Sequence, residues 1–112
     1  MSENALHELS KKIYAGTTNI VGPSLRDVIL FGSYARGDYD AESDIDIALI
    51  VSEGRDEIKR YNRDLVHLVS DISLNDDILV SICCIPESEF ETYKEAMPFY
   101  RNINIEGVRL NA

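Results

Sequence analysis

The stretch FGSYARGDYDAESDIDIALIV, residues 31–51, decides the fold. It begins with a small-residue turn after an apolar run and ends with a second apolar run that two aspartates open. In Asp44-Ile45-Asp46-Ile47 acidic and apolar residues alternate, which is the period of a strand. Because alternate strand residues share a face, we expect both aspartates to face one way and both isoleucines to face a core.

This pair of carboxylates predicts a cation site. Two carboxylates on one face repel each other unless a positive charge lies between them, and Mg²⁺ is commonly held by one or two carboxylates plus substrate phosphates. Upstream, Gly32 allows a close approach of backbone to phosphate, and Ser33 offers a hydroxyl and an amide. A helix starting there would add oriented N–H groups. The combination indicates nucleoside triphosphate chemistry.

A calcium loop is the rival interpretation, because acidic residues also alternate from Asp38 to Asp46. An EF-hand loop requires glycine at its sixth position and glutamate at its twelfth, where this sequence has Ser43 and Leu49. The strand pattern that follows is also wrong for a helix-flanked loop. The sequence contains neither a Gly-Lys-Ser/Thr phosphate loop nor a Gly-x-Gly-x-x-Gly motif. The calcium interpretation is therefore rejected.

The composite motif resembles a known family. Gly32-Ser33, ten intervening residues and Asp44-x-Asp46 resemble the signature of the DNA polymerase β-like nucleotidyltransferase superfamily. The fuller strings GSYARG and SDID resemble its minimal nucleotidyltransferases, and MPFYRN with EGV near the end resembles the tail of some stand-alone members. The resemblance implies a nucleotidyltransferase fold, ATP as substrate and two Mg²⁺ ions held by three carboxylates.

Residue by residue, the resemblance assigns Asp44 and Asp46 to the first two metal-binding, catalytic carboxylates. The third comes from a neighbouring strand in this family. Asp77, which opens the next apolar run, is the predicted third carboxylate, with Asp76 as the alternative. Aspartate before a strand is also common as turn chemistry. If neither serves, the site would bind nucleotide and catalyse poorly.

The phosphate-binding residues follow in the same way. The resemblance assigns Gly32 and Ser33 to the phosphates, against the alternative of an ordinary tight turn. Arg36 is placed to contact the triphosphate or a partner, and a solvated arginine is the competing interpretation. All three are predicted nucleotide-binding residues.

The rest of the chain predicts a single α/β (α+β) domain over residues 1–112, with a small mixed sheet and helices packed mainly on one face. Hydrophobic periodicity predicts helices over residues 3–19, 55–71 and 87–97 and strands over 26–31, 44–51 and 77–85. We expect the second strand to be central because it is so continuously apolar. The tail from Phe99 is expected to be a loop with a short helical turn.

Composition narrows the functional classes. The chain carries 20 acidic and 11 basic residues, a net charge of −9, which disfavours nucleic-acid binding and suits a small nucleotide with Mg²⁺ or a basic protein partner. No apolar run approaches a membrane span, and Met1–Asn4 shows no signal-peptide pattern, so we expect a cytoplasmic protein. Cys83 and Cys84 are adjacent in a predicted strand, too poorly placed to pair with each other.

The expected function is transfer of a nucleoside monophosphate, AMP from ATP, to an acceptor hydroxyl with release of pyrophosphate. Minimal members of the family are often paired with a helical HEPN-type protein as a toxin–antitoxin module, which implies a tyrosine of that partner as acceptor. The alternative is a catalytically weak module that neutralises its partner by contact alone. An antibiotic adenylyltransferase would usually carry an additional helical domain. The sequence leaves a homo-oligomer open.

Overall fold

The structure, a computed structural model, describes residues 1–111 as one mixed sheet between two layers of helices. The strands are β1 (Leu25–Phe31), β2 (Ile45–Val51), β3 (Val80–Pro86) and β4 (Val108–Arg109). The helices are α1 (Glu3–Val21), α2 (Ser33–Arg36), α3 (Arg55–Ile58), α4 (Asn62–Asp76), α5 (Glu87–Tyr93) and α6 (Pro98–Glu106). Short 3₁₀ turns, η1 (Gly22–Ser24) and η2 (Lys59–Tyr61), join α1 to β1 and α3 to α4.

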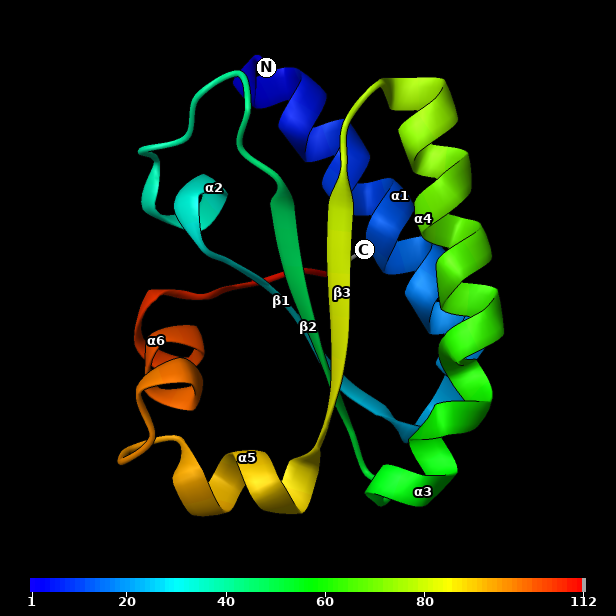
Figure 1. Cartoon of the computed structure of the whole chain (residues 1–112), viewed down its shortest axis with the longest axis vertical. Coiled ribbons are helices and arrows are strands. Elements are labelled where there is room, and N and C mark those ends of the chain that lie inside the picture. Colours follow the sequence, from blue (N-terminus) through cyan, green and yellow to red (C-terminus); the bar gives the residue numbers. More distant parts are fainter. Residues whose placement is uncertain (112) are drawn as a thin grey trace.

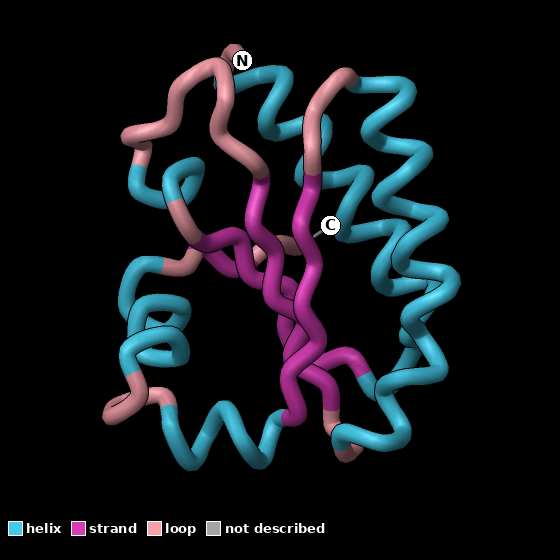
Figure 2. The backbone as a smooth tube through the Cα atoms, viewed as in Figure 1, coloured by secondary structure: helices cyan, strands magenta, loops and turns pink. Residues whose placement is uncertain are grey.

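The sheet runs in the order β3-β2-β1-β4 (Figure 2). β1 pairs antiparallel with both β2 and β4, whereas β2 pairs parallel with β3, so the sheet is mixed as predicted. β2 lies inside the sheet, and every residue from Ile47 to Val51 is buried. The prediction of a central second strand is confirmed.

Alternating residues of the strands pack into two separate hydrophobic cores, one on each face of the sheet. Ile45, Ile47 and Leu49 of β2 pack with α1 and α4, which lie together on one side of the sheet in Figure 1. Ala48 and Ile50 face the opposite side, where α5 and α6 cover the sheet. The two longest helices therefore share one face, and a second, smaller core holds the short helices on the other.

The long first helix begins and ends where local chemistry indicates. The Ser2 hydroxyl accepts a 3.0 Å hydrogen bond from the Ala5 N–H, which satisfies one of the unpaired donors of the first turn. The helix ends at Gly22, whose φ of 75° is strained for any residue with a side chain. Between them, Leu9, Ile13 and Val21 are buried against the sheet.

Several predicted elements have different bounds in the structure, among them the third strand, which begins at Val80. The helix predicted over residues 55–71 is interrupted by η2 and continues to Asp76. The helix predicted over residues 87–97 ends at Tyr93, and the tail forms α6 and β4 in place of a loop. Pro98 starts α6 where we expected it only to stop the preceding helix, because proline is well tolerated at the first helical position.

Among residues 1–111, none of the helices combines the length and apolar character that spanning a lipid bilayer requires. Cys83 and Cys84 belong to the two different cores, as expected for neighbours in a strand. Burial raises the pKa of both thiols to about 11, so both are protonated at neutral pH.

Candidate active site

The site lies at the end of the sheet where β1 stops and β2 begins. Asp46 is the second residue of β2, and its ladder neighbours are Phe31 on β1 and Ser81 on β3. Directly paired residues of neighbouring strands carry their side chains on the same face. Asp46 therefore lies between an aromatic side chain and a hydroxyl, on the face that α5 and α6 cover further along the strand.

The alternation at the start of β2 separates core from site. Ile45 and Ile47 are buried in the larger core, with at most 1% of each side chain exposed. Asp46 points to the other face and is partly exposed, and Asp44 precedes it by two residues. The two carboxylates thus come from one strand end, which is the arrangement that the sequence pattern indicates.

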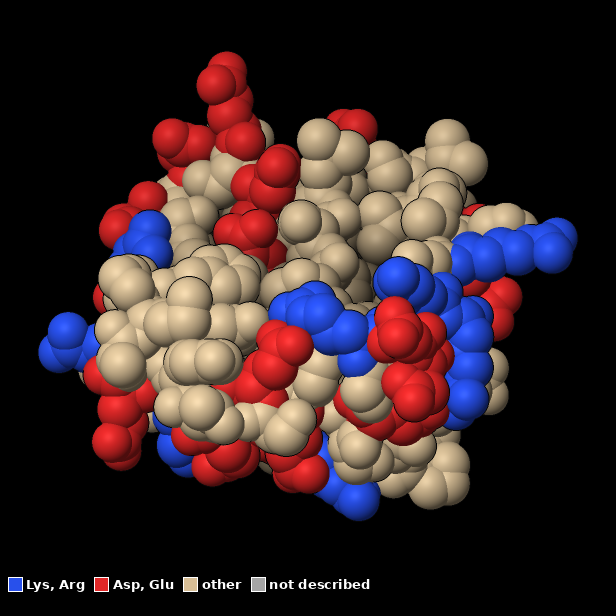
Figure 3. Space-filling view, turned by 60° about the horizontal axis from the view of Figure 1, so that its bottom comes forward, with Lys and Arg blue, Asp and Glu red and all other residues tan. Residues whose placement is uncertain are grey.

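This pair is electrostatically strained. Burial raises the pKa of Asp46 above its usual value, and the negative charge of Asp44 raises it further, whereas Arg36 lowers it. Acidic side chains also gather at the upper left of Figure 3, on the side of the molecule where the loop between α2 and β2 lies. A divalent cation would relieve this repulsion, so the donor set fits a hard, oxygen-liganded metal ion.

Gly32 lies in close contact with the Asp46 carboxylate and has a positive backbone φ. Its φ is 75°, and a Cβ built there would meet Asp46 Oδ2 at under 3.0 Å. The positive φ strains any residue with a side chain here, and the Asp46 carboxylate would have to move to make room for one. Ser33 then opens α2, and the first amides of a helix have no acceptor within it. The turn therefore brings backbone N–H groups beside the carboxylate pair.

The loop between α2 and β2 is held by aromatic stacking. The rings of Tyr34 and Tyr39 stack with centroids 4.2 Å apart and planes 14° apart. The Tyr39 hydroxyl donates a 3.2 Å hydrogen bond to the carbonyl of Met1. The acidic loop is thereby tied to α2 on one side and to the start of the chain on the other.

Arg36 is engaged within the protein. Its guanidinium donates to Asp38 Oδ2 at 3.1 Å and to Glu106 Oε2 at 3.4 Å. These bonds join α2 to the end of α6, and the Arg36 side chain stays 45% exposed. A role for Arg36 in nucleotide binding would require these exposed ion pairs to open.

The predicted third carboxylate lies outside the strand. β3 begins at Val80, so Asp77 is a turn residue after α4, with a left-handed φ of 52°. Asp77 and Asp44 line the same hollow of about 600 Å³. Asp76 binds Lys12 across a 2.8 Å ion pair. Over residues 1–111, the structure brings no three acidic, histidine or cysteine side chains together as a metal site.

Sequence reasoning missed Ser81 and Phe99. The parallel register places Ser81, an exposed hydroxyl, at the position of β3 beside Asp46. Phe99 of α6 meets Phe31 edge-on with ring centroids 5.7 Å apart, which extends the aromatic side of the site. Ser81 is the one polar residue of the run Ile78–Ile85 apart from its cysteines, and that was the available signal. No local signal identified Phe99, because α6 itself was not predicted.

A glycine–serine turn beside a carboxylate pair at the start of a central strand defines the class as a nucleotide-transferring domain. The chain belongs to the nucleotidyltransferase domain family, whose pattern it matches over residues 21–109. The resemblance in sequence is therefore confirmed, and the chain is a nucleotidyltransferase.

Two similar relatives come from Methanocaldococcus jannaschii. MJ0141, named as a candidate protein adenylyltransferase, is 42% identical over 74 residues, which are 66% of this chain and 73% of the relative. MJ0604, named in the same way, is 32% identical over 83 residues, 74% of this chain and 75% of the relative.

Solved structures show the same fold. A toxin–antitoxin complex with AMP-PNP matches with a TM-score of 0.58 at 23% identity, over 92% of this chain and 73% of the other. A candidate nucleotidyltransferase from Sulfolobus solfataricus matches with a TM-score of 0.52 at 26% identity, over 97% of this chain and 87% of the other. A mutant of the toxin–antitoxin MntA–HpeT matches with a TM-score of 0.55 at 21% identity, over 92% and 73%. The predicted nucleotidyltransferase fold is confirmed.

Proposed function

We propose that this chain transfers AMP from ATP to a hydroxyl group of a protein. The observation that carries the proposal is the position of Asp46, which lies against Gly32, between Phe31 and Ser81, at the end of the sheet. The names of the two M. jannaschii relatives support a protein as the acceptor. The toxin–antitoxin structures of the same fold support a partner toxin, and we propose a tyrosine of a helical HEPN-type protein.

In the proposed reaction the acceptor hydroxyl oxygen forms a bond to the α-phosphorus of ATP. The bond from that phosphorus to the oxygen bridging to the β-phosphate breaks, pyrophosphate leaves and the hydroxyl proton passes to solvent. Asp44 and Asp46 would hold Mg²⁺, with Asp77 as the proposed third ligand. Bound Mg²⁺, two ions in the family scheme, supplies charge neutralisation of the triphosphate and activation of the attacking oxygen.

The backbone at Gly32 and Ser33 would bind the phosphates in this scheme, and Arg36 would bind the triphosphate once released from Glu106. Phe31 is the neighbour of Asp46 on one side, and Ser81, its neighbour on the other side, is exposed. The acceptor would enter from this exposed side, because α5 and α6 cover the same face further along the strands.

The test is label transfer from α-labelled ATP with Mg²⁺, with and without a co-expressed neighbouring protein. We expect label on a protein, released pyrophosphate, and loss of both by at least about a hundredfold in Asp44→Asn/Asp46→Asn, because removing one electrostatic contact to the reacting group typically costs that much. Asp56→Asn/Asp64→Asn is the matched control, since it removes the same charge from exposed helix positions. The same assay with Asp77→Asn decides whether Asp77 is the third carboxylate.

A second function, neutralisation by contact alone, is favoured by one observation. The described residues contain no assembled three-carboxylate site, and a missing ligand would weaken catalysis more than binding. Partner binding that survives the Asp44/Asp46 double substitution, together with no label transfer by the unsubstituted protein, would select this function over the enzyme.

A further inference from the structure

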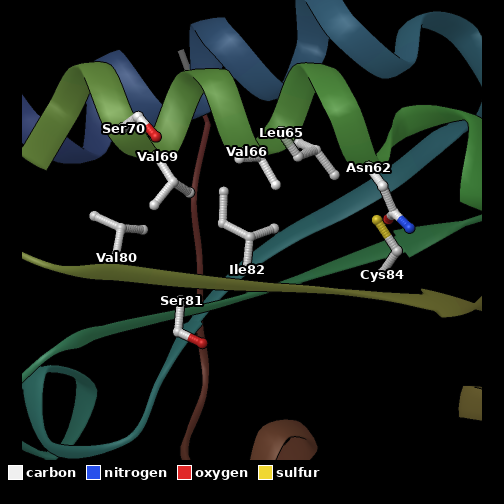
Figure 4. A pocket seen from close by; sticks show the side chains of 9 residues that line it. All are labelled: Asn62, Leu65, Val66, Val69, Ser70, Val80, Ser81, Ile82 and Cys84. Atoms are coloured by element: carbon white, nitrogen blue, oxygen red, sulfur yellow. The ribbon is translucent and has the colours of Figure 1, made fainter.

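The outer edge of β3 is open. β3 is the last strand on its side of the sheet, and among residues 1–111 no strand pairs with its free edge. Figure 4 views this edge, with α4 above β3 and a groove between them. The groove has a volume of about 330 Å³ and is lined by Asn62, Leu65, Val66, Val69, Ser70, Val80, Ser81, Ile82 and Cys84.

This edge lacks the features that usually prevent strands from pairing. Natural proteins protect free edges with charged side chains, prolines, bulges or a covering element. From Val80 to Ile85 the strand has no charge and no proline, and its pairing with β2 runs without a bulge. Alternate backbone N–H and C=O groups of β3 therefore point outward, in position to pair with another strand.

The helix above the edge is uncharged on the same side. Asn62, Val66 and Ser70 follow one another at four-residue spacing, which places them in one stripe of α4. In Figure 4 Val66 and Asn62 point from α4 toward β3, and Ser70 lies against the helix itself. Val66 is 61% exposed although it is apolar. The charged residues of α4 lie off this stripe.

We propose that β3 and α4 form an interface with a second copy of this chain, in which the two β3 strands pair antiparallel. Charge selects this occupant. Each copy carries a net charge of −9, so two copies repel everywhere except where neither presents charged groups, and this groove is such a surface. A strongly basic partner would gain more on the acidic surfaces elsewhere.

Symmetry supports the same occupant. A two-fold axis perpendicular to the sheet reverses the strand direction and keeps each face on its own side, so one strand can pair with its own copy. The sheets of two copies would then continue into each other. The two α4 helices would lie side by side on one face, where Val66 of each copy is covered. Asp46 and Ser81 carry their side chains on the other face of the sheet, so the paired α4 helices would not cover the face that holds the candidate active sites.

The test is the molar mass of the purified full chain in sedimentation velocity over a dilution series from about 1 μM to about 1 mM. We expect a dimer, and a monomer for Val66→Glu and for Ser70→Glu, each of which puts one negative charge into the groove. Asn75→Glu adds the same charge to α4 at an exposed position on the opposite side of the helix from the stripe, and this variant should remain dimeric. Circular dichroism confirms that each variant is folded.

Three outcomes would overturn the proposal. The unsubstituted chain could be monomeric throughout the series. A dimer could survive both groove substitutions, which would place the interface elsewhere. All three substitutions could weaken the dimer equally, which would make net charge rather than this face responsible.

Discussion

Gly32 and Asp46 depend on each other. A side chain at residue 32 would displace the Asp46 carboxylate, and the positive φ there disfavours one independently. The glycine thus lets the carboxylate lie against the turn, where burial and Asp44 raise its pKa. The cost of ionising Asp46 in this position should therefore be measurable as a change in folding stability.

The pH dependence of stability is the first prediction. Because the pKa of Asp46 is raised in the folded state, ionising Asp46 costs more in the folded than in the unfolded chain. This cost is absent below the usual pKa of 3.8 and is fully present above the raised value. We therefore expect Asp46→Asn, which cannot ionise, to melt at a higher temperature than the unsubstituted protein at pH 7, with a smaller difference toward acid pH.

Asp38→Asn is the control for this experiment. Asp38 is 62% exposed and accepts a hydrogen bond from Arg36, so its removal relieves no repulsion inside the site. It should leave the melting temperature unchanged or slightly lower, without a pH trend in the same direction. A lower melting temperature for Asp46→Asn at neutral pH would show that its carboxylate is satisfied rather than strained.

The elements show which features follow from local sequence. The strand at Asp44–Val51 and its acidic–apolar alternation could be predicted because side-chain period is a local property. The register between β2 and β3 could not be predicted. These parallel strands are connected through α3 and α4, and the packing of both helices on the sheet determines how the strands align. Ile78 and Leu79 look like strand residues, yet Leu79 is 59% exposed and the strand starts after it. That error is why Asp77 was expected inside the strand and Ser81 was overlooked.

α6 was missed for a different physical reason. Pro98 marks a break in any sequence pattern, and the residue before it, Met97, is extended, as proline requires of its predecessor. A break of this kind can equally end one helix or begin the next. What stabilises α6 is tertiary: Ile103 is fully buried in the smaller core beneath the sheet. Packing of this kind leaves little local signal.

The second prediction concerns this helix. We expect Ile103→Ala to lower the free energy of unfolding by about 2–5 kcal/mol, because it removes buried methyl groups and leaves a cavity. Ile105→Ala is the matched control two residues away, where the side chain is 65% exposed, and should change stability by less than about 0.5 kcal/mol. Urea unfolding measures both. Equal effects would mean that α6 does not pack on the sheet.

At the scale of the whole molecule, charge distribution distinguishes two kinds of association. The net charge of −9 is spread over surfaces other than the α4–β3 groove. A basic partner would be drawn to the charged surfaces, whereas a second copy of the chain would be repelled by them. Salt therefore weakens the attraction to a basic partner but also weakens the repulsion between two copies of the chain.

The third prediction follows from that sign. Raising NaCl from about 0.1 M to about 1 M shortens the Debye length from about 10 Å to about 3 Å. Self-association through the uncharged groove should tighten, because the repulsion between copies is screened. Binding to a basic toxin partner should weaken over the same range. Sedimentation at each salt concentration measures the first and titration calorimetry the second; self-association that weakens with salt would point to a charged interface.

The stacked pair Tyr34 and Tyr39 gives the site an optical signal of its own. The chain contains no tryptophan. Its tyrosines therefore account for its near-ultraviolet fluorescence and for most of its near-ultraviolet circular dichroism. The electronic transitions of two stacked rings whose centroids are 4.2 Å apart couple strongly. One of the two, Tyr39, belongs to the acidic loop that leads into Asp44. Whatever binds between Gly32 and that loop would alter the coupling of the rings, so binding can be followed spectroscopically in the unlabelled, unsubstituted protein.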